Sequence, residues 1–203
     1  LVIDRLVRRR EALLLHFLMN FTGVMFSFLV NLKVGAITFF VSFLLWLYSN
    51  DLKRRALIGN LLIAFLTALS LIIVAIYFDN GYLLVYCYAL FSFLISIARE
   101  VVKDMEDVQG DESHGCKTLP ILKGVLFAKK FVYVVFISLF ISMVLISKVM
   151  NSLAMLVTTS LVLVLLAFIS YKLYYADKKK DFRILGNLCK LVMLLGVFSM
   201  VLA

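Results

Sequence analysis

Half of the acidic side chains of this chain gather in one short segment. The sequence holds twelve Asp and Glu residues, and six of them fall within thirteen positions: Glu100, Asp104, Glu106, Asp107, Asp111 and Glu112. In a helix, Glu100, Asp104, Asp107 and Asp111 would share an arc of about 60°. Stacked carboxylates repel one another and favour a cation. Mg²⁺ suits them because it accepts one or two carboxylates and completes its shell with phosphate oxygens. The pattern predicts a magnesium site for a phosphorylated ligand, and the alternative is a solvated helix end.

The elements that must position these carboxylates are long apolar stretches. The chain has 203 residues, is 64% hydrophobic and has a mean hydropathy of +1.07, so its polar surface is too small for a water-soluble domain. Stretches near the ~20 residues that cross a bilayer as a helix run over residues 11–31, 34–50, 56–78, 81–98, 125–147, 152–171 and 184–203. They are continuously apolar and too long for barrel strands. We predict an all-α, polytopic transmembrane helix bundle of about seven spans.

The net charge of +9 is explained by membrane topology rather than by nucleic-acid binding. Eighteen of the 21 basic residues lie in alternate loops, which are 5–10, 53–55, 99–130 and 172–183. The intervening loops carry only Lys33 and Lys148, and Lys190 lies inside a span. The positive-inside rule assigns the basic loops to the cytoplasm. We therefore expect a multi-pass protein of the cell membrane with its acidic segment facing the cytoplasm.

The chain reads as one domain over residues 1–203. No proline-rich, serine-rich or low-complexity linker divides it. Its longest connection is the cytoplasmic segment 99–124, which carries the acidic cluster. The three cysteines are widely spaced, which argues against disulfides and a zinc cluster.

The acidic segment resembles a known motif. Residues 99–111, REVVKDMEDVQGD, followed by residues 115–121, GCKTLPI, are similar to the second aspartate-rich motif of the UbiA superfamily of intramembrane prenyltransferases. Within it they most resemble the geranylgeranylglycerol-phosphate geranylgeranyltransferase branch. A second stretch, with Tyr48, Lys53 and Arg54 before Gly59 and Asn60, resembles the family's other cytoplasmic loop, in which a tyrosine and a lysine face a diphosphate.

The resemblance implies Mg²⁺-dependent transfer of a polyprenyl group from an allylic prenyl diphosphate to a lipophilic acceptor. Geranylgeranylglyceryl phosphate or a related polar lipid is the favoured acceptor, and an aromatic quinone precursor is the alternative. Asp104, Asp107 and Asp111 would be catalytic metal ligands, with Glu100 contributing. The substrate phosphates would be bound by a second group of side chains: Tyr48, Lys53, Arg54, Asn60, Arg99 and Lys117. No protein partner is implied.

Family members have nine helices and a first motif of the form Asn-x-x-x-Asp-x-x-x-Asp. This motif has no match here, because Asn50 and Asn151 have no acid four residues on. The opening residues resemble the loop that follows the first motif, and the chain begins with Leu1 rather than Met. We therefore expect seven helices that correspond to the last seven of a longer protein, with the first motif upstream of Leu1.

Three other functions fit these residues less well. A cation transporter would place its acids near the bilayer midplane, whereas these lie beyond the inner end of a span. A CDP-alcohol phosphotransferase needs Asp-Gly and Ala-Arg before Gly-x-x-x-Asp-x-x-x-Asp, which the run from Asp104 to Asp111 does not supply. A structural scaffold gives no reason for the acids to cluster.

Overall fold

The computed structural model describes residues 8–78, 83–150 and 153–202. Within these residues, seven helices are long and apolar enough to cross a membrane, as predicted. They are α1 (Arg9–Val30), α2 (Leu32–Asn50), α3 (Ile58–Phe78), α4 (Leu83–Ser113), α6 (Val125–Met150), α7 (Leu153–Tyr175) and α8 (Lys179–Leu202). A 3-10 turn, η1 (Leu52–Arg54), and a short helix, α5 (Leu119–Lys123), lie in the connections. The all-α transmembrane architecture is confirmed.

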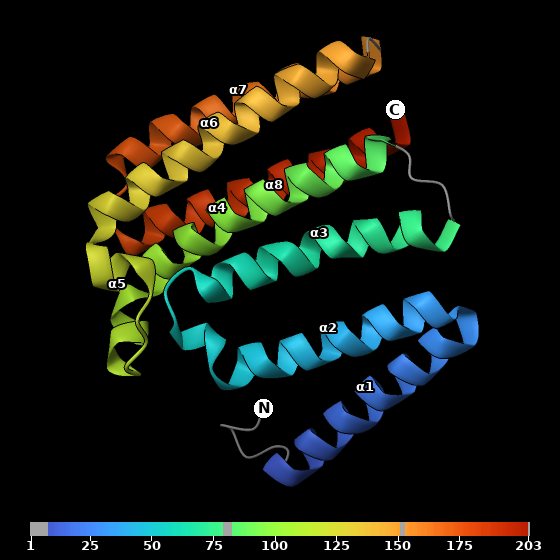
Figure 1. Cartoon of the computed structure of the whole chain (residues 1–203). Helices are drawn as coiled ribbons and strands as arrows, with labels where there is room; N and C mark the ends of the chain where they lie inside the picture. The colour runs from blue at the N-terminus through green and yellow to red at the C-terminus, as the bar shows by residue number, and fades with distance from the viewer. Residues whose placement is uncertain (1–7, 79–82, 151–152, 203) are drawn as a thin grey trace.

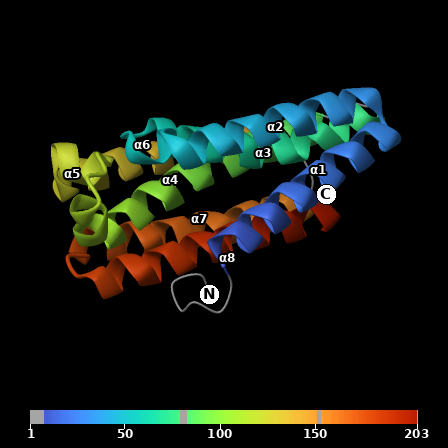
Figure 2. The ribbon, with the colours of Figure 1, turned by 90° about the horizontal axis from the view of Figure 1, so that it is seen from below.

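Helix α4 is the centre of the bundle. It packs against α3, α6 and α8, and α7 covers α6 and α8 (Figures 1 and 2). In its most apolar window 56% of the residues are buried, against 6% for α1, which packs only on α2 among the described residues. In a membrane protein, a central helix is covered by other helices and a peripheral helix is covered largely by lipid. Helix α4 is of the first kind and α1 of the second.

Small residues allow α3 to approach α4 closely. The buried residues of α3 are all small, namely Gly59, Ala64, Ala68 and Ala75. Small side chains bring helix backbones together in membranes, where packing and interhelical hydrogen bonds replace the hydrophobic effect as the cause of association. This close approach sets which residues of the two helices meet at their ends.

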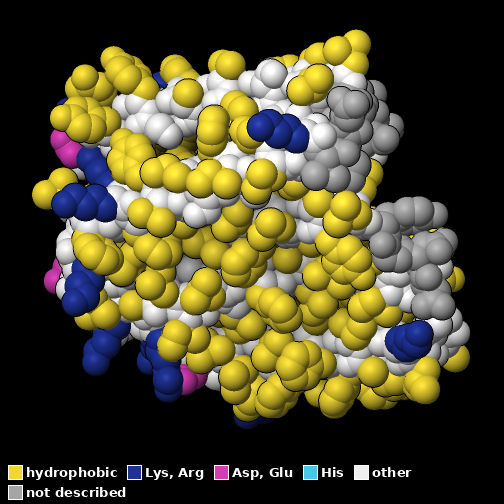
Figure 3. All heavy atoms as spheres, turned by 45° about the horizontal axis from the view of Figure 1, so that its top comes forward, with side chains coloured by type: hydrophobic (Ala, Val, Ile, Leu, Met, Phe, Trp, Pro, Cys, Tyr) yellow, Lys and Arg dark blue, Asp and Glu magenta, His cyan; other side chains and the backbone are white. Residues whose placement is uncertain are grey.

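The polar residues gather at one end of the bundle. Helix α4 has 31 residues, so at 1.5 Å per residue it is about 46 Å long and exceeds the ~30 Å hydrocarbon core by several turns. Its last turns project from the bundle before the chain returns to α5 (Figure 1). On the face drawn in Figure 3, most Lys, Arg, Asp and Glu side chains lie toward this end, and hydrophobic side chains cover the middle. We call it the polar end.

Helix α4 continues past the predicted span and ends at Ser113, so the clustered acids lie on one helix, which is the condition for their common arc. The assignment of the polar end to the cytoplasm stays a prediction. Arg5, the external connection at 79–81 and Asn151 lie outside the described residues.

Candidate functional site

Two loops that the sequence analysis singled out lie against each other at the polar end. The backbone N–H of Lys117 donates a 2.8 Å hydrogen bond to the carbonyl oxygen of Arg54, and Arg55 and Lys117 form an isolated parallel bridge. The first loop follows α2 and the second follows α4. The backbone contact therefore fixes the Tyr48–Asn60 segment against the end of the acidic helix.

A side-chain hydrogen bond also joins the same two segments. The amide nitrogen of Asn60, in the first turn of α3, donates a 2.7 Å bond to a carboxylate oxygen of Asp104 on α4. The pKa of Asp104 is raised to about 7, mainly because its carboxyl group is buried. The hydrogen bond from Asn60 opposes this shift, and the nearby carboxylates of Asp111 and Glu100 add to it. A cation close to Asp104 would stabilise its ionised form.

Tyr48 and Lys53 lie near these carboxylates. Glu100, Asp104 and Asp111 are all close enough to Tyr48 to act on it electrostatically. Asp111 lies near Lys53 and Asp107, and burial together with Asp107 raises the pKa of the Asp111 carboxyl. The structure thus brings donors for phosphate oxygens, the Tyr48 hydroxyl and the Lys53 ammonium, to the face of α4 that carries Asp104.

Gly59 provides the space in which the first loop packs. A Cβ atom at this position would lie 2.8 Å from the carbonyl oxygen of Leu52 and 3.2 Å from a ring carbon of Tyr48. Backbone carbonyl oxygens cannot rotate away as a side chain can. The loop that carries Lys53 can therefore pack here only because Gly59 has no side chain.

We expect Gly59→Ala to lower the free energy of unfolding by about 1–3 kcal/mol relative to Gly23→Ala, because the η1 backbone must shift. Gly23→Ala is the matched control, since a Cβ there would meet nothing within 4 Å. Thermal unfolding of both variants in detergent measures the difference. Equal midpoints would show that the loop accommodates the added methyl group freely.

Asp107 and Glu106 point toward another helix. Asp107 lies 3.6 Å from the ammonium of Lys179, the first residue of α8. Glu106 accepts a 2.9 Å hydrogen bond from the guanidinium of Arg183 on the same helix. Asp107 stands at the edge of the predicted arc, from which it reaches both Asp111 and α8. The sequence correctly predicted that Glu106 lies off the arc, but its partner was not foreseen.

The remaining predicted site residues have different surroundings. Arg99 forms an ion pair with the buried Glu100 beside it. The side chains of Arg54 and Lys117 are exposed, although their backbones hold the two loops together. Each of these cations is thus at the polar end, whereas Lys53 and Lys103 lie near enough to Asp111 to act on its charge.

The carboxylates fit one half of a magnesium site. Among the described residues, no three His, Cys, Asp or Glu side chains are gathered as a complete metal-binding group. However, Asp104 lies close to both Asp111 and Glu100, and burial together with these charges raises the pKa of the Asp104 carboxyl. A hard divalent cation needs only one or two protein carboxylates when phosphate oxygens and water supply the rest. Asp104 and Asp111, with Glu100, would supply them on this face, and Asp107 at its edge.

Sequence reasoning missed the contribution of α8. Arg183, Asn187 and Lys190 lie on one face of that helix, at i, i+4 and i+7, and line a cleft with residues of α4. The signal was present, because Lys190 interrupts a predicted span and Arg183–Asn187 looks like the Arg55–Asn60 segment.

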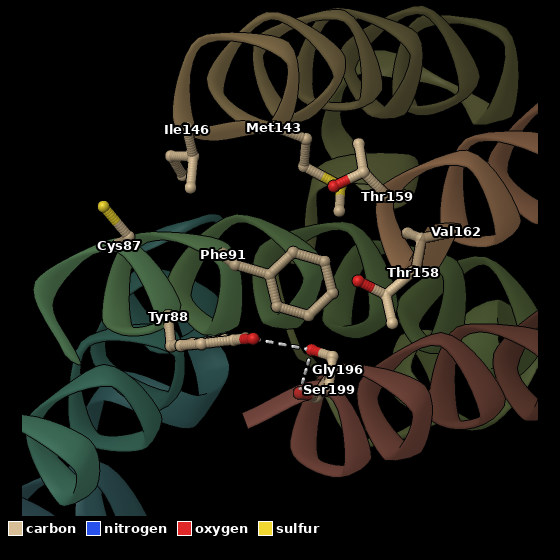
Figure 4. Close-up of a pocket in the computed structure, with 10 residues that line it drawn as sticks. All are labelled: Cys87, Tyr88, Phe91, Met143, Ile146, Thr158, Thr159, Val162, Gly196 and Ser199. Carbon is tan, nitrogen blue, oxygen red and sulfur yellow. Dashed lines mark hydrogen bonds between the residues drawn. The ribbon is translucent and has the colours of Figure 1, made fainter. Parts of the chain in front are cut away.

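An apolar cavity at the opposite end of the bundle belongs to packing. It is lined by Phe91, Met143 and Val162, and by Tyr88, whose hydroxyl lies 2.8 Å from that of Ser199 (Figure 4). Its volume of about 30 Å³ holds no more than one or two water-sized groups. Tyr88 and Asp104 are separated by about 24 Å along α4. The cavity is therefore too small and too distant to be the substrate site.

Comparison with known proteins places this chain among intramembrane transferases. Residues 1–198 match the UbiA prenyltransferase family. Proteins named digeranylgeranylglyceryl phosphate synthase are similar over part of the chain. The one from Methanosphaera stadtmanae is 31% identical over 121 residues, which are 58% of this chain and 43% of that protein. The one from Methanobrevibacter smithii is 38% identical over 119 residues, which are 57% of this chain and 42% of that protein. The match thus spans less than half the length of these relatives.

Two solved structures share the fold. A structure titled as giving insights into digeranylgeranylglyceryl phosphate synthase in membranes superimposes with a TM-score of 0.78 at 22% identity, covering 97% of this chain and 70% of that one. The apo structure of a UbiA homologue from Aeropyrum pernix K1 gives a TM-score of 0.80 at 16% identity, covering 100% of this chain and 75% of that one. At these identities the likeness concerns the fold.

Proposed function

Because the chain belongs to the UbiA prenyltransferase family, we propose that it transfers a polyprenyl group from an allylic prenyl diphosphate to a hydroxyl of a glyceryl phosphate acceptor. The observation that carries this proposal is the contact between the acidic end of α4 and the Tyr48–Asn60 segment, through the Asn60–Asp104 hydrogen bond. The names of the relatives support geranylgeranylglyceryl phosphate as the acceptor.

The basic and hydroxyl groups of the two loops would bind the diphosphate. Lys53 and Tyr48 lie beside the carboxylates and would donate to phosphate oxygens. Arg54 and Lys117 are exposed at the same end, and their backbone hydrogen bond keeps the two loops in register. Arg99 is in reach of this end of α4 but would have to share its charge with Glu100.

The carboxylates would hold magnesium on the other side of the diphosphate. Asp104, Asp107 and Asp111 are the proposed ligands, with Glu100 contributing. Asn60 acts as a positioning residue, because its hydrogen bond orients one oxygen of Asp104 and leaves the other free. When bound, Mg²⁺ would neutralise charge on the departing diphosphate.

The reaction exchanges one carbon–oxygen bond for another. The bond between the allylic carbon and the diphosphate oxygen breaks, and the diphosphate leaves with the electron pair. The acceptor oxygen then forms a bond to that carbon and releases its proton to water or to the diphosphate. The apolar helices around α4 would keep water away from the allylic carbon, which otherwise would be hydrolysed.

Transfer is tested with the full-length protein in detergent, Mg²⁺ and radiolabelled geranylgeranyl diphosphate. We expect label to enter the ether lipid when geranylgeranylglyceryl phosphate is supplied, at least about 10-fold faster than into a 4-hydroxybenzoate-type aromatic acceptor. The product is separated by chromatography. The reverse preference would favour the aromatic alternative, and label in neither acceptor would contradict prenyl transfer.

A further inference from the structure

A second polar feature lies on the side of α4 that faces α8. There α4 and α8 border a cleft of about 320 Å³. Four basic side chains line it: Arg99 and Lys103 from α4, and Arg183 and Lys190 from α8. This face differs from that of Asp104, whose hydrogen-bonding partner is on α3.

The two helices run antiparallel, and one ion pair sets their register. Glu106 contacts Arg183 at the outer end of the cleft. Two helical turns further in on each helix are Arg99 and Lys190, so these cations lie opposite each other at the inner end. Between these two levels, Lys103 lies opposite Gly186, where an added Cβ would meet nothing within 4 Å. The cleft is therefore hollow at its middle.

The charges of the cleft are unbalanced at its inner end. Its two acids, Glu106 and Asp107, are both at the outer end and contact Arg183 and Lys179. Lys190 donates a 3.2 Å hydrogen bond to Asn187 and has no carboxylate within ion-pair distance in the described part of the chain. Lys103 also forms no ion pair among the described residues, although its charge acts on Asp104 and Asp111 over a longer distance.

Lys190 is about 16 Å along α8 from its first residue, which places its charge within an apolar helix. Lys190 is level with Arg99 at the inner edge of the polar end, and a lysine that interrupts an apolar span is a candidate for function when it borders a cleft. Asn187 can accept a hydrogen bond but supplies no negative charge.

Given the proposed function, we infer that the cleft between α4 and α8 binds the phosphate monoester of the acceptor lipid. Lys190 and Lys103 are the direct partners of the phosphate, and Asn187 holds the Lys190 ammonium in place. Leu194 lies one turn beyond Lys190 on the same face and is exposed, so it offers apolar surface to the acceptor chain.

This placement separates the two phosphorylated substrates. The donor diphosphate lies on the carboxylate face of α4, where metal is needed to offset negative charge. The acceptor phosphate lies on the α8 face, where the protein itself supplies the cations. Lys103 and Asp104 are neighbours on α4 and point about 100° apart, so the two phosphate groups would lie on adjacent faces of the helix and the substrates could meet at the edge between them.

The first test compares the KM values of the acceptor and of the donor. In full-length protein, Lys190→Gln should raise the KM for geranylgeranylglyceryl phosphate by at least about 10-fold, because a charge-assisted hydrogen bond is lost. The KM for the prenyl diphosphate should change by less than about twofold. Lys190→Arg should keep most of the affinity. Lys148→Gln, which removes an exposed lysine at the opposite end, is the matched control.

A steric variant tests the site without changing charge. Gly186→Leu would fill the hollow opposite Lys103 and should also raise the acceptor KM at least about 10-fold, with the donor KM unchanged. Thermal unfolding in detergent confirms that both variants fold. An unchanged acceptor KM in both folded variants, or a raised donor KM, would overturn the inference.

Binding measured without turnover keeps this inference distinct from the proposed function. Native mass spectrometry of the full-length protein should show preferential binding of geranylgeranylglyceryl phosphate over geranylgeranylglycerol, and Lys190→Gln should abolish the preference. If the wild type catalyses no transfer but shows this Lys190-dependent preference, the cleft is a phosphate site and the proposed function fails. If transfer occurs and the preference does not depend on Lys190, the cleft assignment fails alone.

Discussion

Replacing Asp104 with Asn is expected to lower the rate of prenyl transfer by about 100-fold or more. The substitution removes one negative charge from the carboxylate group that would hold magnesium, and loss of a single charge-stabilising group in an active site costs on this order. The shape of the site should be kept, because the new amide oxygen can still accept the hydrogen bond from Asn60. The effect would therefore be on charge rather than on folding.

Steady-state transfer by the full-length protein measures this effect, and thermal unfolding in detergent measures stability. Glu112→Gln is the matched control, since Glu112 is an exposed acid at the end of the same helix and lies off the Asp104 face. Its activity should stay near that of the wild type. Activity of Asp104→Asn within about threefold of the wild type would contradict the assigned role.

Removal of divalent metal is expected to have an effect of similar size. With excess chelator, transfer should fall by about 100-fold or more, because the charge that develops on the departing diphosphate would no longer be neutralised. Added Mg²⁺ in excess of the chelator should restore the rate. The Mg²⁺ concentration for half-maximal rate should be higher in Asp111→Asn, whose carboxylate lies near Asp104.

The control for this experiment is the thermal stability of the protein. The bundle is held by helix packing, so the protein should remain folded in excess chelator, as thermal unfolding would show. Turnover that persists at full rate in excess chelator would mean that the carboxylates serve another purpose. The alternative interpretations, a cation transporter or a solvated helix end, would then be favoured.

Local pattern was sufficient to predict the helices and the common face of the acidic residues. Hydropathy over about 20 residues predicts a span because a helix must satisfy its own backbone in lipid, wherever it packs. The spacing of Glu100, Asp104 and Asp111 predicts a common face because the helical period is the same in every context. Both properties depend on neighbours along the chain, and both predictions agree with the course of α4.

The partners of these residues depend on tertiary structure. Asn60 meets Asp104 because Gly59, Ala64 and Ala68 let α3 lie close to α4 and thereby fix the rotation and register of the two helices. The contact between Lys117 and Arg54 joins loops more than 60 residues apart. Neither pairing leaves a periodic signal in the sequence.

The number of spans, the acidic face and the residue types available for binding phosphate and metal all follow from composition and helical period, so they can be predicted from the chain alone. The packing of the helices is needed to know that Asp107 and Glu106 contact α8 and that Lys190 borders a cleft. The physical reason is that side chains on one helix select no partner until packing sets the angle and depth of the neighbouring helix.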